Sequence, residues 1–559
     1  MPQSPSLPII PDSERTPLVE RLLEQIERLM QDGLRQTELI QQLRDEIAVL
    51  KGEKARPKFK PSGMETGTDP DDPDEGGDDA PGGDGSEGDT SDPSDKPNKR
   101  PGSTKRNKTR DLEIHKTTVL KPRVPPPEGS VFKGYRDFTV QDLQIAAHNT
   151  RYRMEVWQTP TGEHLVGELP AHLHGGHFGA ELRRFVLYQH HHCHVTQPLL
   201  HEQLREWGID LSVGQVDALL SRGNEAFFAE KDALLTTALE VSAFISVDDS
   251  GARHQGRNGY VTQIGNDYFA WFESTSSKSR INFLQLLHAG SITYRLNAHA
   301  IEYLREEGLP KEPLRRMMTH LTGEIAEPAC WEQHLDALGI ESERHRRIAT
   351  EGALLGGLIA KGFSLDLAIV SDGAGQFAIL LHALCWVHAE RLVHKLIPLN
   401  EQHRLDQARV RDEIWGLYAD LKAYRRNPDL AQAPGLEARF DAIFSQRTSF
   451  ETLNQTLKRL HGHREKLLLV LKRPDIPLHT NGSEGDIRGY VKWRKISGGT
   501  RSDLGKRCRD SFASLNKTCR KLGISFWGFL ADRIQLQGAI PLLPDIVRQR
   551  AAATGAMGY

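Results

Sequence analysis

Two short apolar runs in this chain each end in aspartate, and this repetition limits the possible folds more than any other feature. Phe244–Val247 leads into Asp248 and Asp249, and Leu367–Ser371 leads into Asp372. A carboxylate just past the end of a buried strand is held at the edge of a sheet while its oxygens face solvent. Turn aspartates commonly end strands, so either run alone is ordinary, and the surrounding sequence has to decide between the two interpretations.

A third carboxylate, Glu484, lies on a segment with a helical pattern. Carboxylate oxygens suit hard divalent cations, and two cations about 4 Å apart can clamp the attacking and leaving oxygens of a phosphodiester. A metal-dependent nuclease needs carboxylates at such places. Because neighbouring residues of a strand point to opposite faces, only one of Asp248 and Asp249 should reach the metals.

The segments between the two aspartate runs predict a mixed α/β sheet. Tyr260–Ile264 and Tyr268–Phe272 flank Gly265-Asn266-Asp267, whose residues tolerate positive φ, so these runs should form a hairpin. The order is then a strand ending in aspartate, two antiparallel strands, helices, and a second strand ending in Asp372. This order is the opening topology of an RNase H-like fold interrupted by a helical insertion.

Composition describes a large protein of several domains, with 559 residues, 26% charged and 38% hydrophobic. The net charge of −3 averages an acidic, Gly/Pro/Ser-rich run over 69–89, expected to be disordered, and a basic run over 96–110. The basic run is either a solvated tail or a nonspecific DNA-contacting arm. Five scattered cysteines and the lack of a signal peptide or a long apolar run predict a cytoplasmic protein.

The N-terminal heptads predict a parallel, two-stranded coiled coil. Val19, Ile26, Ile40 and Ile47 fall at a positions. The d positions hold leucine, at Leu22, Leu29, Leu43 and Leu50. Isoleucine at a with leucine at d favours dimers, and the alternative is an amphipathic helix packed on its own protein.

Further along, the pattern becomes helical after a strand-like stretch with a hairpin signal at Pro160-Thr161-Gly162. Gln197–Leu204 should form one helix, and Ser212 should cap a second over Val213–Leu220. Two helices joined by a glycine-containing turn outline a helix-turn-helix, although a plain helical hairpin has the same pattern.

The chain resembles the insertion sequence 66 family of transposases over nearly its whole length. Asp248-Asp249-Ser250 matches the triplet that begins with the family's first catalytic acid, and Asp372-Gly373-Ala374 matches the second. A cysteine-tryptophan-histidine helix motif of the family is matched by Cys385–Arg391, and the run around its third acid is matched by Asn481, Glu484 and Arg488. The chain departs from the family where Gly485 replaces an arginine and where a cysteine-rich zinc module is absent.

The resemblance implies a transposase that cleaves and joins DNA strands with two Mg²⁺ ions, for which Mn²⁺ can substitute. Asp248, Asp372 and Glu484 would be the catalytic residues and metal ligands, with Cys385 and His388 as structural residues near the site. Arg488 lies four residues after Glu484 and could orient its carboxylate or reach a phosphate. The cationic DNA-binding surface would comprise Arg488, Lys492, Arg494, Lys495 and Arg501.

The predicted fold class is therefore α/β, with an RNase H-like mixed-sheet core, helical insertions, an N-terminal coiled coil and a helix-turn-helix-like region. Expected partners are double-stranded DNA (element ends and target), a second copy through the coiled coil, and small accessory proteins of the element. Two alternatives stay open: a DNA-binding regulator descended from a transposase, and an RNase H-like nuclease without strand transfer. The predicted domains are a coiled coil (13–53), an acidic then basic linker (54–110), a small β-rich module (111–170), a helical DNA-binding region (171–238), a catalytic domain (239–505, insertions 281–362 and 401–470), and C-terminal helices (506–559).

Overall fold

The computed structural model describes residues 113–169, 176–319 and 323–556, together with scattered positions between 16 and 36. All of those scattered positions except Thr16 are helical, and Leu22, Ile26 and Leu29 among them are exposed. The remainder of the predicted coiled coil, and the whole linker over 54–110, lie outside the described residues. The described chain divides into two compact units, one of 113–151 with 204–210 and the other of 152–203 with the residues from 211 onward.

The segment before the first helix contains less sheet than the sequence suggests. Residues 113–155 contain no regular helix or strand, and the predicted β-rich module has regular strands only in the hairpin of β1 (Val156–Gln158) and β2 (His164–Val166). Gly162, with φ of +87°, makes the predicted turn, and its amide donates to the Thr159 carbonyl. Both strands are exposed along their length, so no apolar face holds a larger sheet together.

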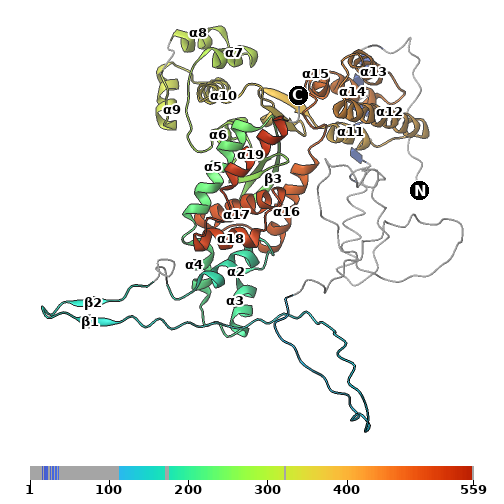
Figure 1. Cartoon of the computed structure of the whole chain (residues 1–559). Coiled ribbons are helices and arrows are strands. Elements are labelled where there is room, and N and C mark those ends of the chain that lie inside the picture. Colours follow the sequence, from blue (N-terminus) through green and yellow to red (C-terminus); the bar gives the residue numbers. More distant parts are fainter. Residues whose placement is uncertain are drawn as a thin grey trace. The chain divides into compact units, whose positions relative to one another are not determined.

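A five-stranded mixed sheet forms the centre of the larger unit (Figure 1). Its strand order is β5-β4-β3-β6-β7, in which β3 pairs antiparallel with β4 and parallel with β6. Gln255 and Gly256, both with positive φ, make the two-residue turn between β3 and β4. The strands are β3 (Phe244–His254), β4 (Arg257–Gly265), β5 (Ala270–Thr275), β6 (Ala368–Ser371) and β7 (Leu381–Leu384).

The prediction that the first strand ends at Asp248 is wrong, because β3 continues to His254. Its parallel pairing with β6 covers only Phe244–Ser246, whereas its antiparallel ladder with β4 runs from Ser246 to the turn. Asp248 therefore lies in the middle of a strand, just beyond the point where one neighbouring strand stops. The second prediction is confirmed, since Asp372 directly follows β6.

Two long helices, α16 (Asn481–Ser497) and α17 (Asp503–Lys521), pack against this sheet and are drawn in red in Figure 1. Tyr490 and Trp493 of α16 share a buried cluster with Val261 and Phe272 of the sheet. Five further helices contact α17: α2 (Ala180–His191), α4 (Val213–Ser221), α5 (Glu225–Val241), α18 (Phe526–Gln535) and α19 (Leu543–Ala556), and α3 (Gln197–Glu206) lies between α2 and α4 in the chain. Ser212 caps α4 as predicted, through a reciprocal capping box with Gln215.

Polar side chains of α17 complete the outer edge of the sheet. β5 is the edge strand, and its outward-facing amides would otherwise lack partners. The Ala270 amide donates to Thr518 Oγ1 (3.1 Å) and the Phe272 amide to Ser514 Oγ (2.9 Å). The Ser274 amide donates to Asp510 Oδ2 (2.8 Å). Residues 510, 514 and 518 recur every four positions, so one face of α17 covers the whole edge.

Helices fill both long connections of the sheet. Between β5 and β6 lie α6 (Arg280–Leu287), α7 (Ala298–Glu306), α8 (Lys311–Thr319), α9 (Pro328–Ala337) and α10 (Glu343–Ala360). After the 3-10 turn η4 (Gly375–Phe377) and β7 come α11 (Trp386–His394), α12 (Glu401–Arg426), α13 (Ala433–Ser445), α14 (Glu451–His461), α15 (Arg464–Leu467) and the 3-10 turn η5 (Leu469–Leu471).

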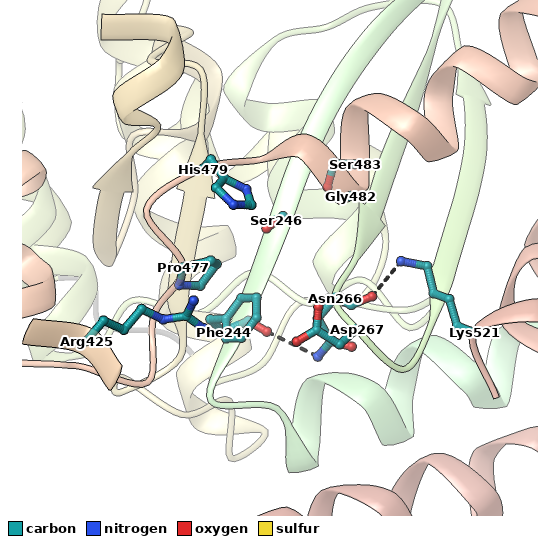
Figure 2. A pocket seen from close by; sticks show the side chains of 10 residues that line it. All are labelled: Phe244, Ser246, Asn266, Asp267, Arg425, Pro477, His479, Gly482, Ser483 and Lys521. Atoms are coloured by element: carbon teal, nitrogen blue, oxygen red, sulfur yellow. Dashed lines mark hydrogen bonds between the residues drawn. The ribbon is translucent and has the colours of Figure 1, made fainter. Parts of the chain in front are cut away.

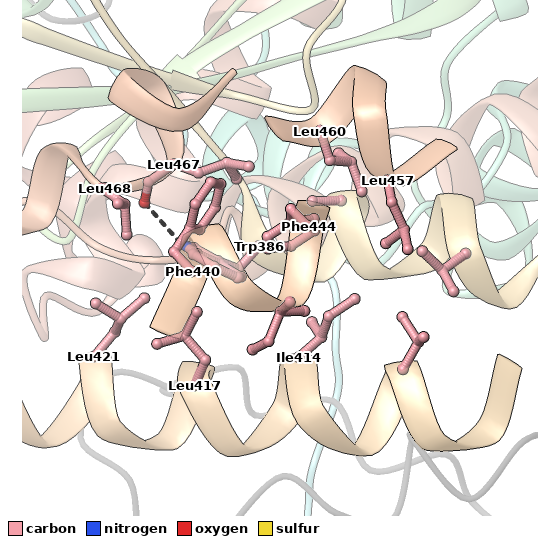
Figure 3. Close-up of a cluster of buried hydrophobic side chains, with 14 of the residues drawn as sticks. Trp386, Ile414, Leu417, Leu421, Phe440, Phe444, Leu457, Leu460, Leu467 and Leu468 are labelled. Atoms are coloured by element: carbon pink, nitrogen blue, oxygen red, sulfur yellow. Dashed lines mark hydrogen bonds between the residues drawn. The ribbon is translucent and has the colours of Figure 1, made fainter. Parts of the chain in front are cut away.

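The second group of helices has a hydrophobic core of its own, centred on Trp386 (Figure 3). α12 contributes Ile414, Leu417 and Leu421, whose spacing of three and four residues places them on one face of the helix. The Trp386 indole donates to the carbonyl of Leu467 at 2.8 Å, which fixes α11 against the α15 region. This core holds α11 rigidly beside the first turn of α16.

Candidate active site

Asp248 lies on the face of the sheet that α16 and α17 cover. It pairs with Gln263, and the residues that follow it on the same face, Ser250 and Ala252, lie opposite Val261 and Gly259 in the layer against α16. Its Oδ1 accepts the Asp249 amide at 2.7 Å. Burial raises the pKa of Asp248 to about 7, and the negative charges of Asp372, Glu484 and Asp249 add to the shift.

Asp249 points to the opposite face and is held there by two donors. Thr262 Oγ1 donates to its Oδ1 at 2.5 Å, and Gln376 Nε2 donates to its Oδ2 at 2.9 Å. Burial raises the pKa of Asp249, while these two hydrogen bonds oppose the shift. Gln376 lies in η4, four residues after Asp372, so Asp249 ties β3 to the loop that carries the second acid.

Asp372 is exposed in the turn that follows β6. Its Oδ1 accepts the Ala374 amide at 2.9 Å, and Gly373 has φ of +95°, a conformation that favours glycine. The Gly373 amide donates to Ser371 Oγ, which also lies 2.8 Å from His382 Nε2. The turn is therefore held from within, and the carboxylate keeps one oxygen toward solvent.

Glu484 lies in the first turn of α16, where its Oε1 faces the imidazole of His388 and the guanidinium of Arg391 on α11. His388 Nε2 is 3.3 Å from this oxygen and Arg391 Nη1 is 3.6 Å from it. Burial lowers the pKa of His388, Glu484 opposes the shift, and Arg391 adds to it. Cys385 is the buried residue before α11, and burial raises the pKa of its thiol. The structure thus places His388 beside Glu484, and Cys385 lies close enough for the charge of Glu484 to act on its thiol.

Arg488 could either orient Glu484 or reach a phosphate; among the described residues Glu484 pairs with His388 and Arg391 and forms no ion pair with Arg488, so contact with a phosphate stays the prediction for Arg488. Arg391 was missed as a partner because its contact joins residues 93 positions apart. Its spacing of three from His388 is the one available signal, since it places both side chains on one face of α11.

Three acids from β3, the turn after β6 and α16 therefore act on one another electrostatically. Their oxygens are the donor type that Mg²⁺ prefers, and a bound cation would offset both the burial and the neighbouring negative charges that raise the pKa of Asp248. The residues thus fit a divalent cation in donor type and in charge. As placed, no group of three His, Cys, Asp or Glu residues in the described chain is close enough to hold one ion.

A small cavity lies beside the carboxylates, lined by ten residues that include Ser246 and Ser483 (Figure 2). Its volume of about 40 Å³ has room for a few water molecules and no nucleotide. Lys521 crosses it to donate to the Asn266 carbonyl at 2.7 Å, and Asn266 Nδ2 donates to the Phe244 carbonyl at 3.3 Å. The cavity is lined from β3, the β4–β5 turn, α12, the segment before α16, the start of α16 and α17, and it is too small for a nucleotide.

The predicted DNA-binding residues all follow Glu484 on one stretch of chain. Arg488, Lys492 and Lys495 are exposed on α16, Arg501 is exposed after it, and Arg494 is half-buried against β3. Gly499, after α16, has no room for a side chain, because a Cβ there would lie 2.4 Å from the Arg253 carbonyl oxygen. In this close approach the Thr500 amide donates to that oxygen at 3.0 Å.

The model of a family described as "Transposase IS66 family" matches residues 342–507, a span that contains Asp372, the α11 motif and Glu484. Asp248 lies outside that span. The chain is also similar to the uncharacterized protein y4jO of Sinorhizobium fredii, with 41% identity over 321 residues, which are 57% of this chain and the whole of that protein. In the described part of the chain, no helix is both long and apolar enough to span a membrane.

Proposed function

This chain belongs to the IS66 family of transposases, and we propose on that premise that it cleaves the strands of an insertion element and joins them to target DNA. The strand order, with three antiparallel strands followed by two parallel ones, supports an RNase H-like core. The single observation that supports the proposed mechanism is that Asp372 and Glu484, each positioned by a different element, lie near enough to Asp248 for their charges to help raise its pKa.

We propose that these three carboxylates hold two divalent cations, Mg²⁺ or Mn²⁺. When bound, such ions activate the attacking oxygen and stabilise the leaving oxygen of a phosphodiester. Asp248 is the better candidate of the two neighbouring aspartates, because it shares a face with α16 while Asp249 is committed to Thr262 and Gln376.

His388 and Arg391 have a positioning role in this proposal. Arg391 attracts the Glu484 carboxylate through its charge, His388 lies 3.3 Å from the same oxygen, and α11 is itself fixed by the Trp386 core. A carboxylate paired in this way has a defined direction before DNA arrives, which reduces the ordering that the reaction requires.

The remaining proposed contacts concern DNA and assembly. Exposed cations on and after α16 (Arg488, Lys492, Lys495 and Arg501, with half-buried Arg494) would contact the phosphate backbone. The helical region over 171–238 would contribute a helix-turn-helix contact, and the N-terminal coil would make the protein a dimer. Small accessory proteins of the same element would complete the assembly.

The test is a paired measurement on Glu484→Gln: nicking of a terminal-repeat duplex in Mg²⁺, and gel-shift affinity at two salt concentrations. We expect nicking to fall by orders of magnitude, because a metal ligand is lost, while affinity stays or tightens as a repelling charge disappears. Glu465→Gln, at an exposed position on α15, is the matched control and should leave both unchanged. Lys495→Ala should do the opposite, weakening binding and reducing the salt slope by about one.

Two results would change the proposal. Nicking that survives in Glu484→Gln would exclude the three-acid mechanism. Binding without any cleavage by the wild-type protein, even with accessory proteins, would favour a transposase-derived regulator. A strand-transfer assay separates the remaining alternative, because a nuclease of this fold would nick the duplex and join nothing.

A further inference from the structure

A second and larger cavity lies on the same side of the sheet, away from the carboxylates. It has a volume of about 230 Å³ and is enclosed by the β3–β4 hairpin, the end of β5, the second half of α16 and the start of α17. We call it the hairpin cleft. Its lining residues are Ala252, Arg253, His254, Gln255, Arg257, Asn258, Gly259, Ser274, Thr275, Ser276, Tyr490, Arg494, Thr500, Lys506 and Arg509.

The hairpin cleft is strongly cationic. Five of its lining residues are arginine or lysine, and none is aspartate or glutamate. Arg257, on the hairpin, and Arg494, on α16, make no side-chain hydrogen bond or ion pair with any described residue. Asp503 is the nearby carboxylate on the rim, 3.1 Å from His254 Nε2 and 3.4 Å from Lys506 Nζ. The positive charge is therefore far from neutralised within the described chain.

The walls of the cleft are fixed in place. The amide of Thr500 donates to the Arg253 carbonyl at 3.0 Å, and the Gln255 amide donates to the Thr500 carbonyl at 2.8 Å, so the hairpin and the α16–α17 connection form one surface. Arg509 is buried over the Trp493 ring, with its Nη1 donating to the Gly498 carbonyl at 2.8 Å.

The floor of the cleft is equally well ordered. The Tyr490 hydroxyl donates to Asp510 Oδ1 at 2.7 Å, and Ser274 Oγ donates to the same carboxylate at 2.9 Å. Asp510 is thus a buried anion behind the floor, and its charge is taken up by these donors. A rigid, polar cavity with unpaired guanidinium groups suits an anion held by several donors at once.

Two elements, β3 and α16, each run from one of the acids to the hairpin cleft. Asp248 and Arg253 are five residues apart on β3, which is about 17 Å at the rise of a strand. Glu484 and Arg494 are ten residues apart on α16, which is about 15 Å at the rise of a helix. Both elements thus lead from the carboxylates to the cleft over the same distance. Successive phosphates of a B-form strand are about 3.4 Å apart along the axis, so this distance spans about four or five nucleotides.

We propose that the hairpin cleft binds the phosphodiester backbone of DNA four or five nucleotides from the phosphate that is cleaved, with Arg257 and Arg494 as its principal contacts. The choice of DNA as the anion rests on the proposed function. The cleft would set the register of the strand relative to the acids, so that a contact far from the chemistry decides which phosphate is cut.

The test combines a double variant, Arg257→Gln with Arg494→Gln, and duplexes that carry neutral methylphosphonates at single positions near the nicking site. Binding is measured by fluorescence anisotropy without Mg²⁺, over a series of salt concentrations. The salt slope of the double variant should fall by about two, one for each lost contact. Arg459→Gln, an exposed arginine on α14, is the matched control and should keep the wild-type slope.

Neutral phosphates supply the positional evidence. Methylphosphonates four or five nucleotides from the nick should weaken wild-type binding several-fold and leave the double variant unaffected, whereas substitutions elsewhere should affect both proteins alike. An equal response of the two proteins at every position would overturn the proposal. A second result would also overturn it: millimolar inorganic phosphate or a free mononucleotide displaces DNA from the wild-type protein but not from the double variant. The cleft would then be a site for small anions.

The binding arm also separates this proposal from the proposed catalytic function. A positional effect on binding in a protein that never nicks DNA would retain the hairpin cleft and reject the enzyme. Normal nicking at the correct phosphate by the double variant, with an unchanged salt slope, would retain the enzyme and reject the cleft.

Discussion

Replacing Asp248 by asparagine should stabilise the metal-free protein, and the gain should grow with pH. Burial, together with the charges of Asp372 and Glu484, raises the pKa of Asp248 from 3.8 to about 7. Between these two values the folded state keeps a proton that the unfolded state has released, so the folded state loses stability as the pH rises from about 4 to about 7. A pKa change of this size corresponds to about 4 kcal/mol. Because the side chain still reaches solvent, we expect the variant to recover about 1–2 kcal/mol at pH 8.

Asp249→Asn is the matched comparison. Removing this charge relieves some of the burial cost, but an asparagine nitrogen turned toward Gln376 or Thr262 loses one of the two hydrogen bonds that the carboxylate accepts. A lost hydrogen bond to a charged group costs about 1.5–3 kcal/mol, so we expect no net gain. The assay is urea unfolding in EDTA at pH 5, 6, 7 and 8, followed by circular dichroism.

Three outcomes would refute this reasoning. One is a loss of stability in Asp248→Asn at pH 8. Another is a gain that is the same at pH 5 and pH 8, since the effect would then not come from the carboxyl proton. The third is an equal gain in Asp249→Asn, which would mean that the two aspartates do not differ in their surroundings.

Three further predictions concern packing, acid stability and assembly. Gly499→Ala should lower the free energy of unfolding by about 2–4 kcal/mol, because its Cβ would meet the Arg253 carbonyl and open the backbone bridge beside it, and a wild-type urea midpoint would contradict this. Burial lowers the pKa of His288 to about 4, so the unfolded chain takes up its proton first and stability falls by at most about 3 kcal/mol as the pH drops from 6.5 to 4. His288→Gln should reduce the change of the melting temperature with pH over that range, whereas His164→Gln, at an exposed position, should leave it as in the wild type. The same pH dependence of the melting temperature in both variants would refute the assignment. Deleting residues 1–55 should convert a dimer to a monomer or a weaker oligomer in light scattering, and an unchanged mass would count against the coiled coil.

Local pattern was enough to predict much of the sheet. The apolar run before Asp372 is short and bounded, so the strand β6 and the position of the aspartate after it followed directly. Ser212 and Gln215 lie three residues apart at the start of a helical pattern, which is the spacing of a capping box. In both cases the deciding interactions lie within a few residues of each other.

Other features depend on contacts that a local pattern does not contain. Residues after Asp249 have no apolar run, so the continuation of β3 to His254 was missed; its ladder is held by backbone hydrogen bonds to β4. The partners of Glu484 lie on α11, more than ninety residues away, whereas the sequence offered Arg488, four residues away, as one candidate partner. The hairpin cleft gathers cations from the hairpin and from two helices, and no single stretch of sequence contains them.

The way in which α17 covers β5 has a consequence for synthesis of the chain. The donors and acceptors that meet at this edge, such as Ala270 and Thr518, are separated by 236 to 248 residues. At about 5–20 residues per second, a ribosome takes roughly 10–50 s to produce the second partner after the first. For that time the nascent β5 presents free amides to any other strand, including the β5 of the next chain on the same message. Nascent chains that stop short of α17 are therefore the ones that chaperones should retain and that proteases should find.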